Sequence, residues 1–130
     1  MVIQTQTALK RCLDHLKRNR LIAIIADRDF GRNGLPMTFL GRRVVLPQGA
    51  ALFSIKTQAP IVPCFFLREQ DGGFSMSLGK PIYPPAHSPG NNGEDSLKEL
   101  MQKYVVTIED HIRRYPTQWL MFRHFEAKNA

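Results

Sequence analysis

Two carboxylates flank an arginine at the end of an apolar run, and a glycine and a second arginine follow. These residues are Asp27, Arg28, Asp29, Gly31 and Arg32. Guanidinium groups bind phosphate through paired N–H donors, so Arg28 and Arg32 are candidate contacts for a phosphorylated ligand. The alternative is that Asp27 caps a turn while its neighbours are solvated. Taken by itself, the segment favours that alternative.

A second candidate site lies at Pro47-Gln48-Gly49, where the sequence predicts the start of a helix. The exposed N–H groups of a helix N-terminus can bind an anion. A glycine at this place permits close approach of a ligand, which makes Gly49 a candidate contact. An ordinary helix start has the same composition, so this signal is also weak when it stands alone.

Four histidines are candidate catalytic bases, namely His15, His87, His111 and His124. None is followed by a carboxylate five positions later, and none pairs with a Ser or Cys nucleophile motif. His111 lies at the edge of an apolar helical stripe, where a structural histidine is the more common case. The sequence also lacks a metal-ligand cluster, a P-loop and a dinucleotide fingerprint, so we predict no cofactor and no metal.

The elements that must position these residues begin with an amphipathic helix over residues 5–19. Residues 21–26 are a short, continuous apolar run, typical of a strand buried on both faces of a parallel sheet. Asp27 would then lie at the carboxyl end of a strand, where open α/β sheets bind ligands. Residues 27–48 predict a long irregular stretch, and residues 49–57 predict a short helix.

The second half of the chain predicts a buried strand, a hairpin turn, an alternating strand, a loop and a long helix. In order, these are residues 59–67, 69–73, 74–78, 81–93 and 97–115. Ser96 with Glu99 predicts a capping box, and Pro116 ends the helix. The aromatic tail around Gln118 and Trp119 predicts either closure of the core, the more common case, or a binding surface. The fold class is therefore α/β, a partial mixed sheet with flanking helices, in a single domain over residues 1–130.

The charge balance predicts an anionic partner. The net charge is +7, from 18 Lys+Arg against 11 Asp+Glu, which favours nucleic acid, phospholipid headgroups or phosphorylated small molecules. Nucleic acid ranks last because no helix-turn-helix, RNA-recognition motif or zinc finger is present. No apolar run reaches the roughly 18 residues of a membrane span, and we see no signal peptide. Cys12 and Cys64 match no metal or redox spacing.

Five segments, in this order, resemble the lipid A biosynthesis acyltransferases, the lauroyl and myristoyl transferases of the glycerolipid acyltransferase superfamily. The first, Asp27-Arg28-Asp29-Phe30-Gly31, is similar to the family's Asp-Gln-Asp-Phe-Gly. It is followed by Phe39-Leu40-Gly41, by Pro47-Gln48-Gly49, by a Thr-Gln-Ala-Pro-Ile-Val-Pro strand at residues 57–63, and by Pro116-Thr117-Gln118-Trp119. Arg28 replaces the family's usual Gln, a change also seen in the related mycobacterial-type phosphatidylinositol mannoside acyltransferases.

The resemblance implies transfer of a fatty acyl group from an acyl carrier protein or coenzyme A thioester to a phosphorylated, lipid A-type glycolipid, in lipopolysaccharide synthesis at the cytoplasmic face of the bacterial inner membrane. It implies substrate contacts in both candidate segments, with Asp27 supporting catalysis. These contacts are Asp27, Arg28, Asp29, Gly31, Arg32 and Gly49.

The family's catalytic His–acid pair and its membrane anchor are expected upstream of the matched segments. A base must take the proton from the acceptor hydroxyl, so we expect this C-terminal portion to be inactive alone. We also expect the enzyme to be peripheral to the membrane, and this portion alone to be soluble and to self-associate through an exposed sheet edge. The alternative is a non-catalytic basic module that binds membranes or anions.

Overall fold

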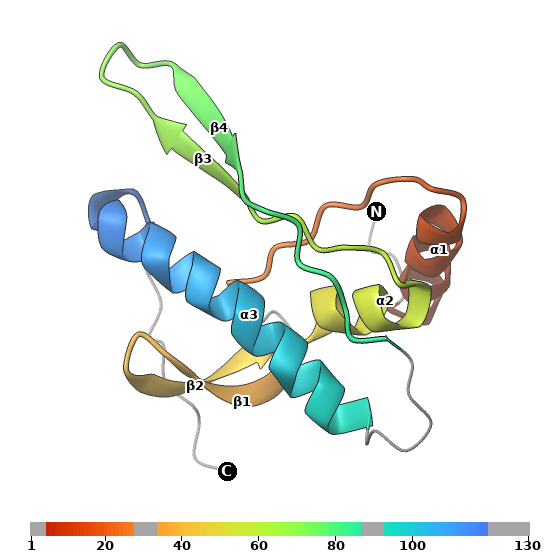
Figure 1. Ribbon diagram of the computed structural model, residues 1–130. Helices are drawn as coiled ribbons and strands as arrows, with labels where there is room; N and C mark the ends of the chain where they lie inside the picture. The colour runs from red at the N-terminus through yellow and green to blue at the C-terminus, as the bar shows by residue number, and fades with distance from the viewer. Residues whose placement is uncertain (1–4, 28–33, 87–92, 120–130) are drawn as a thin grey trace.

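The computed structural model describes residues 5–27, 34–86 and 93–119. In these ranges the chain has the mixed α/β arrangement that the sequence predicts, built from three α-helices and two separate two-stranded antiparallel sheets (Figure 1). The elements are α1 (Thr5–Lys17), β1 (Gly34–Phe39), β2 (Arg42–Pro47), α2 (Gly49–Thr57), β3 (Cys64–Arg68), β4 (Phe74–Leu78), α3 (Gly93–Arg114) and the 3₁₀ turn η1 (Pro116–Gln118).

Helix α1 forms as predicted, but the buried strand predicted after it does not. Asn19 ends the helix with a positive φ of 55°, and the N–H of Arg20 donates to the carbonyl of His15 at 3.0 Å, a common helix ending. Residues 21–26 pair with no strand in the described part of the chain, and Leu21 is 88% and Ile25 63% exposed. An apolar run forms a strand only where a neighbouring strand pairs with its backbone N–H and C=O groups. Residues 21–26 have no such neighbour among the described residues.

The predicted irregular stretch is wrong from Gly34 onward, because β1 and β2 form a hairpin there. The strands pair from Gly34 with Pro47 to Phe39 with Arg42. Leu40 and Gly41 connect them, with φ of 50° and 76°, the backbone of a tight two-residue hairpin turn. The N–H of Leu40 donates to Oε1 of Glu109 on α3 at 2.6 Å. The prolines and glycines of this stretch indicated a loop, whereas they lie at strand ends, in the turn or on the exposed side.

The core lies between α3 and the β1–β2 hairpin, which α3 crosses (Figure 1). Its largest fully buried side chains come from these elements and are Phe39, Leu46, Leu100, Met101 and Val105. The hydroxyl of buried Tyr104 donates to the carbonyl of Pro47 at 3.2 Å, and burial raises the pKa of this phenol. The apolar stripe predicted for this helix is buried at Leu97, Leu100, Met101, Tyr104, Val105 and Ile112, whereas its last predicted member, Tyr115, lies beyond the helix and is 41% exposed. The capping box is wrong, because α3 starts at Gly93 and Ser96 already lies inside the helix.

The β3–β4 hairpin projects from the rest of the molecule (Figure 1). Its turn is confirmed by the hydrogen bond from the N–H of Glu69 to the carbonyl of Gly73 at 2.9 Å. The buried strand predicted for residues 59–67 begins only at Cys64, and its predicted burial is wrong because its side chains alternate between exposed and partly buried. The register brings five exposed apolar side chains to one side of the hairpin. This hairpin face consists of Cys64, Phe66, Phe74, Met76 and Leu78.

Candidate functional site

Asp27 is held by a side chain from the far end of the chain. The indole Nε1 of Trp119 donates to Oδ2 of Asp27 at 3.0 Å, and both residues are partly buried. The Trp119 ring also meets Phe39 edge to face, with ring centroids 5.9 Å apart and an interplanar angle of 74°. Three of the segments that carried the family resemblance therefore meet at one place.

Gln118, next to Trp119, fixes a different element. Its Oε1 accepts from the N–H of Arg68 at 2.7 Å, and its Nε2 donates to the carbonyl of Arg68 at 3.2 Å. The side-chain amide thus occupies the edge of β3 in the manner of a neighbouring strand. Together, Gln118 and Trp119 connect the end of α3 to β3 and to Asp27.

Gly49 is the first residue of α2, as predicted. The N-cap residue Gln48 has φ −90° and ψ −2°, and the N–H of Leu52 donates to its carbonyl at 2.9 Å. A Cβ built on Gly49 would meet no atom within 4 Å, so the space beside this helix N-terminus is open. The structure joins Gly49 to Asp27 by no hydrogen bond in the described part of the chain.

The remaining predicted contacts, Arg28, Asp29, Gly31 and Arg32, lie outside the described residues. Their roles stay predictions. The structure adds two residues that sequence reasoning had not assigned to Asp27 or to β3, namely Trp119 and Gln118. The sequence signals for them were the aromatic character of this tail and the similarity of Pro116-Thr117-Gln118-Trp119 to a segment of the family.

His111 has a structural environment. Its ring stacks on Phe65 of β3, with centroids 3.8 Å apart and an angle of 10°, and Tyr115 lies at 5.1 Å. Burial, and secondarily the charge of Arg114, hold the pKa of His111 below its ordinary value. A neutral imidazole that joins α3 to the hairpin fits these contacts. This supports the structural interpretation made from the sequence.

The lowered pKa of His111 predicts an acid-sensitive packing. The unfolded chain binds the proton more readily than the folded chain, so stability is complete above the unfolded pKa, ordinarily 6.5, and falls as the pH drops below it. We expect the urea midpoint to fall between pH 7.5 and 5.5 by more in the wild type than in His111→Phe, which keeps a ring on Phe65. An equal loss in both proteins would contradict this prediction.

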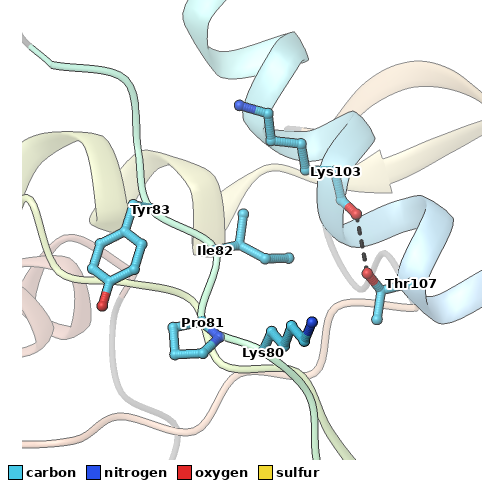
Figure 2. A pocket seen from close by; sticks show the side chains of 6 residues that line it. All are labelled: Lys80, Pro81, Ile82, Tyr83, Lys103 and Thr107. Atoms are coloured by element: carbon cyan, nitrogen blue, oxygen red, sulfur yellow. Dashed lines mark hydrogen bonds between the residues drawn. The ribbon is translucent and has the colours of Figure 1, made fainter.

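A surface pocket of about 510 Å³ lies beside α3, where the chain leaves β4. Its lining residues are Lys80, Pro81, Ile82, Tyr83, Lys103 and Thr107 (Figure 2). The hydroxyl of Thr107 donates to the carbonyl of Lys103 at 3.2 Å, and the Lys103 ammonium pairs with Glu99 at 2.8 Å. Two lysines thus line this pocket together with the apolar side chain of Ile82. None of the predicted site residues lines this pocket.

No helix within residues 5–27, 34–86 and 93–119 combines the length and apolar character of a membrane span.

Comparison with known proteins identifies the family. The sequence model described as bacterial lipid A biosynthesis acyltransferase matches residues 1–125. A phosphatidylinositol mannoside acyltransferase of Mycolicibacterium smegmatis is 27% identical over 110 residues, which are 85% of this chain and 33% of that protein. Its namesake from Mycobacterium tuberculosis is 25% identical over 85% of the chain and 32% of its own length. This chain spans about a third of the length of these relatives. Because the family match covers nearly all of it, the chain belongs to the bacterial lipid A biosynthesis acyltransferase family.

Proposed function

We propose that the chain forms the C-terminal part of an acyl-transfer site, in which a fatty acyl group moves from an acyl carrier protein or coenzyme A thioester to a hydroxyl of a phosphorylated glycolipid. The observation that supports this most directly is the meeting of Asp27, Phe39 and Trp119. Trp119 connects the Asp27 carboxylate to Phe39, so three family-like segments are linked at a group to which an acceptor hydroxyl can donate.

The relatives are named for phosphatidylinositol mannoside, whereas the family is named for lipid A. Both names describe phosphorylated lipids that carry sugar hydroxyls, and we propose an acceptor of that class. The net charge of +7 suits such an acceptor and a peripheral place on the cytoplasmic face of a bacterial inner membrane. The headgroup would lie near Asp27 and Gly49, with the predicted contacts at Arg28, Asp29, Gly31 and Arg32 completing its surroundings.

The reaction requires a general base, and none of the histidines of this sequence has the spacing to a carboxylate that the family's base has. The acceptor oxygen attacks the thioester carbonyl, the C–O bond forms and the C–S bond breaks. The base takes the proton of the hydroxyl and passes it to the leaving thiolate. No histidine of the sequence is followed by a carboxylate five positions later. His111 is stacked against Phe65. We therefore propose that the base comes from another part of a larger enzyme and that this chain alone binds without turning over.

An assay of the purified chain tests this proposal. With an acyl-coenzyme A and phosphatidylinositol vesicles, we expect no ester product above the no-protein control. We also expect binding of the vesicles that Asp27→Ala weakens and that Asp14→Ala, an exposed carboxylate of α1, leaves unchanged. Turnover that disappears in Asp27→Ala would contradict the proposed inactivity. Binding that is indifferent to Asp27 would contradict the proposed acceptor contact.

The second candidate function is a non-catalytic module that binds anionic membranes. The specific observation in its favour is the hairpin face, on which Phe66 and Phe74 are each 67% exposed. Arg68 pairs with Phe74 and lies over its ring, so this face is both apolar and basic, like surfaces that lie in a membrane interface. This function predicts sedimentation with phosphatidylglycerol vesicles that weakens with salt and with Phe66→Ser, and that is unaffected by Asp27→Ala.

We also propose self-association through the outer edge of β4. The β3–β4 sheet has two strands, and the amide of Gln118 already occupies the edge of β3 at Arg68. Pairing of β4 with β4 of a second copy would cover the other edge. A sedimentation-equilibrium experiment at several concentrations tests this, and a monomer throughout would contradict it.

A further inference from the structure

We infer that Trp119 is a positioning residue for Asp27: its indole N–H fixes one carboxylate oxygen, so that the other oxygen is presented to a hydroxyl of the bound acceptor. This inference deepens the proposed function and rests on it for the identity of the ligand. The pairing itself rests only on the geometry of the two side chains.

The chemistry of the two groups makes their roles unambiguous. An indole nitrogen only donates a hydrogen bond, and an ionised carboxylate only accepts. The 3.0 Å bond to Oδ2 is therefore a charge-assisted bond with one possible direction. In the described part of the chain it is the one hydrogen bond that the Asp27 carboxylate makes. Oδ1 keeps its capacity to accept.

The donor is itself held in place from two sides. The Trp119 ring packs edge to face on Phe39, which is only 1% exposed. The preceding residue, Gln118, is tied by two hydrogen bonds to the backbone of Arg68. Because Phe39 holds the ring and Gln118 holds the adjoining backbone, the indole loses little further freedom when it binds the carboxylate. The position of Asp27 is therefore set before a ligand binds.

The competing interpretation is that Trp119 simply closes the core. That role needs the ring and not its N–H group, because the contact with Phe39 is made by the aromatic ring. The positioning role needs the N–H. Trp119→Phe keeps an aromatic ring for Phe39 and removes the donor, so it separates the two roles. Gln118→Ala is the matched variant, because it removes the two hydrogen bonds to Arg68 and keeps the indole N–H of Trp119.

The pairing is tested directly because Trp119 is the one tryptophan of the sequence. The chain labelled with ¹⁵N gives a single indole N–H cross-peak. We expect Asp27→Asn to move the indole proton to higher field, because a neutral amide oxygen is a weaker acceptor than a carboxylate. Asp14→Asn, at an exposed position of α1, should leave the cross-peak in place. A cross-peak that does not respond to Asp27→Asn overturns the inference.

The function of the pairing is tested by headgroup preference. Vesicles of phosphatidylcholine are prepared with phosphatidylinositol, which offers ring hydroxyls, or with phosphatidic acid, which offers a phosphate alone. We expect the wild type to prefer phosphatidylinositol, and Trp119→Phe to reduce that preference about tenfold, as befits one charge-assisted hydrogen bond. The binding of Trp119→Phe to phosphatidic acid vesicles should equal that of the wild type.

The outcomes distinguish the pairing of Trp119 with Asp27 from the identity of the acceptor. An unchanged preference in Trp119→Phe overturns the positioning role even if the cross-peak has confirmed the pairing. A parallel loss of binding to both lipids supports a purely structural role and also counts against the inference. A wild type without any preference counts against the proposed acceptor, whereas the cross-peak experiment still decides whether Trp119 holds Asp27.

Discussion

Replacing Phe39 by alanine is expected to lower the free energy of unfolding by about 3 to 5 kcal/mol. Phe39 is 1% exposed, lies in the core beneath α3 and carries the edge-to-face contact with Trp119. Its removal costs the burial of a large aromatic ring and leaves a cavity that the surrounding side chains fill only in part. Domains commonly have about 5 to 15 kcal/mol of stability in total, so this loss takes a large share of it.

Urea denaturation followed by circular dichroism measures this effect. Phe66→Ala is the matched control, since the same atoms are removed from a side chain that is 67% exposed on the hairpin face. We expect this control to change the unfolding free energy by about 0.5 kcal/mol or less. The fluorescence of Trp119 should also shift to longer wavelength in Phe39→Ala as its ring loses a partner. Equal losses in the two variants would contradict the assigned core.

Gly34→Ala is expected to destabilise the chain by about 1 to 3 kcal/mol, as over-packing does in well-packed structures. A Cβ at this position would lie 2.5 Å from Cγ1 of Val45 and 2.6 Å from the carbonyl oxygen of Leu46. The second atom belongs to the backbone of the paired strand β2, so the clash is relieved only by moving the hairpin. The expected fall in Tm is several degrees, since a domain of about 100 residues loses about 4 to 8 °C per kcal/mol.

Gly49→Ala is the control for this prediction. A Cβ there would meet nothing within 4 Å, and the residue begins α2. Because alanine favours a helix more than glycine, we expect an unchanged or slightly raised Tm. Scanning calorimetry of the two variants gives the comparison. A Gly34→Ala protein as stable as Gly49→Ala would show that β1 and β2 do not approach as closely as described.

The helices were predictable because their signals are local. The apolar stripe of α3 and the face of α1 are set by side chains three or four residues apart, and Pro116 marks the end of α3 from the sequence alone. The β1–β2 hairpin was missed because Leu40 takes a positive φ that Asn or Gly would have signalled, and because Pro36 lies at an exposed position of β1. The strand predicted for residues 21–26 failed because burial depends on a partner that an apolar run does not encode.

The candidate site was only partly predictable for a related reason. Asp27 and Gly49 were singled out by their types and by resemblance to the family, and the structure gives each a defined position. The bond between Asp27 and Trp119 joins residues 92 positions apart. No periodicity connects such residues. The aromatic tail was predicted either to close the core or to form a binding surface. The contact of Trp119 with Phe39 agrees with the first, and the second stays a prediction.

The hydrogen bond between Leu40 and Glu109 has a consequence for the order in which the chain folds. The β1–β2 hairpin and α3 are each held by contacts between near neighbours in sequence, which form quickly. The bond from the Leu40 N–H to Glu109 spans 69 positions and forms only when the completed helix reaches the turn. Closing a loop over that span costs conformational entropy, which slows the formation of such non-local contacts. We therefore expect the turn and the helix to make this contact late in folding, after each has formed locally.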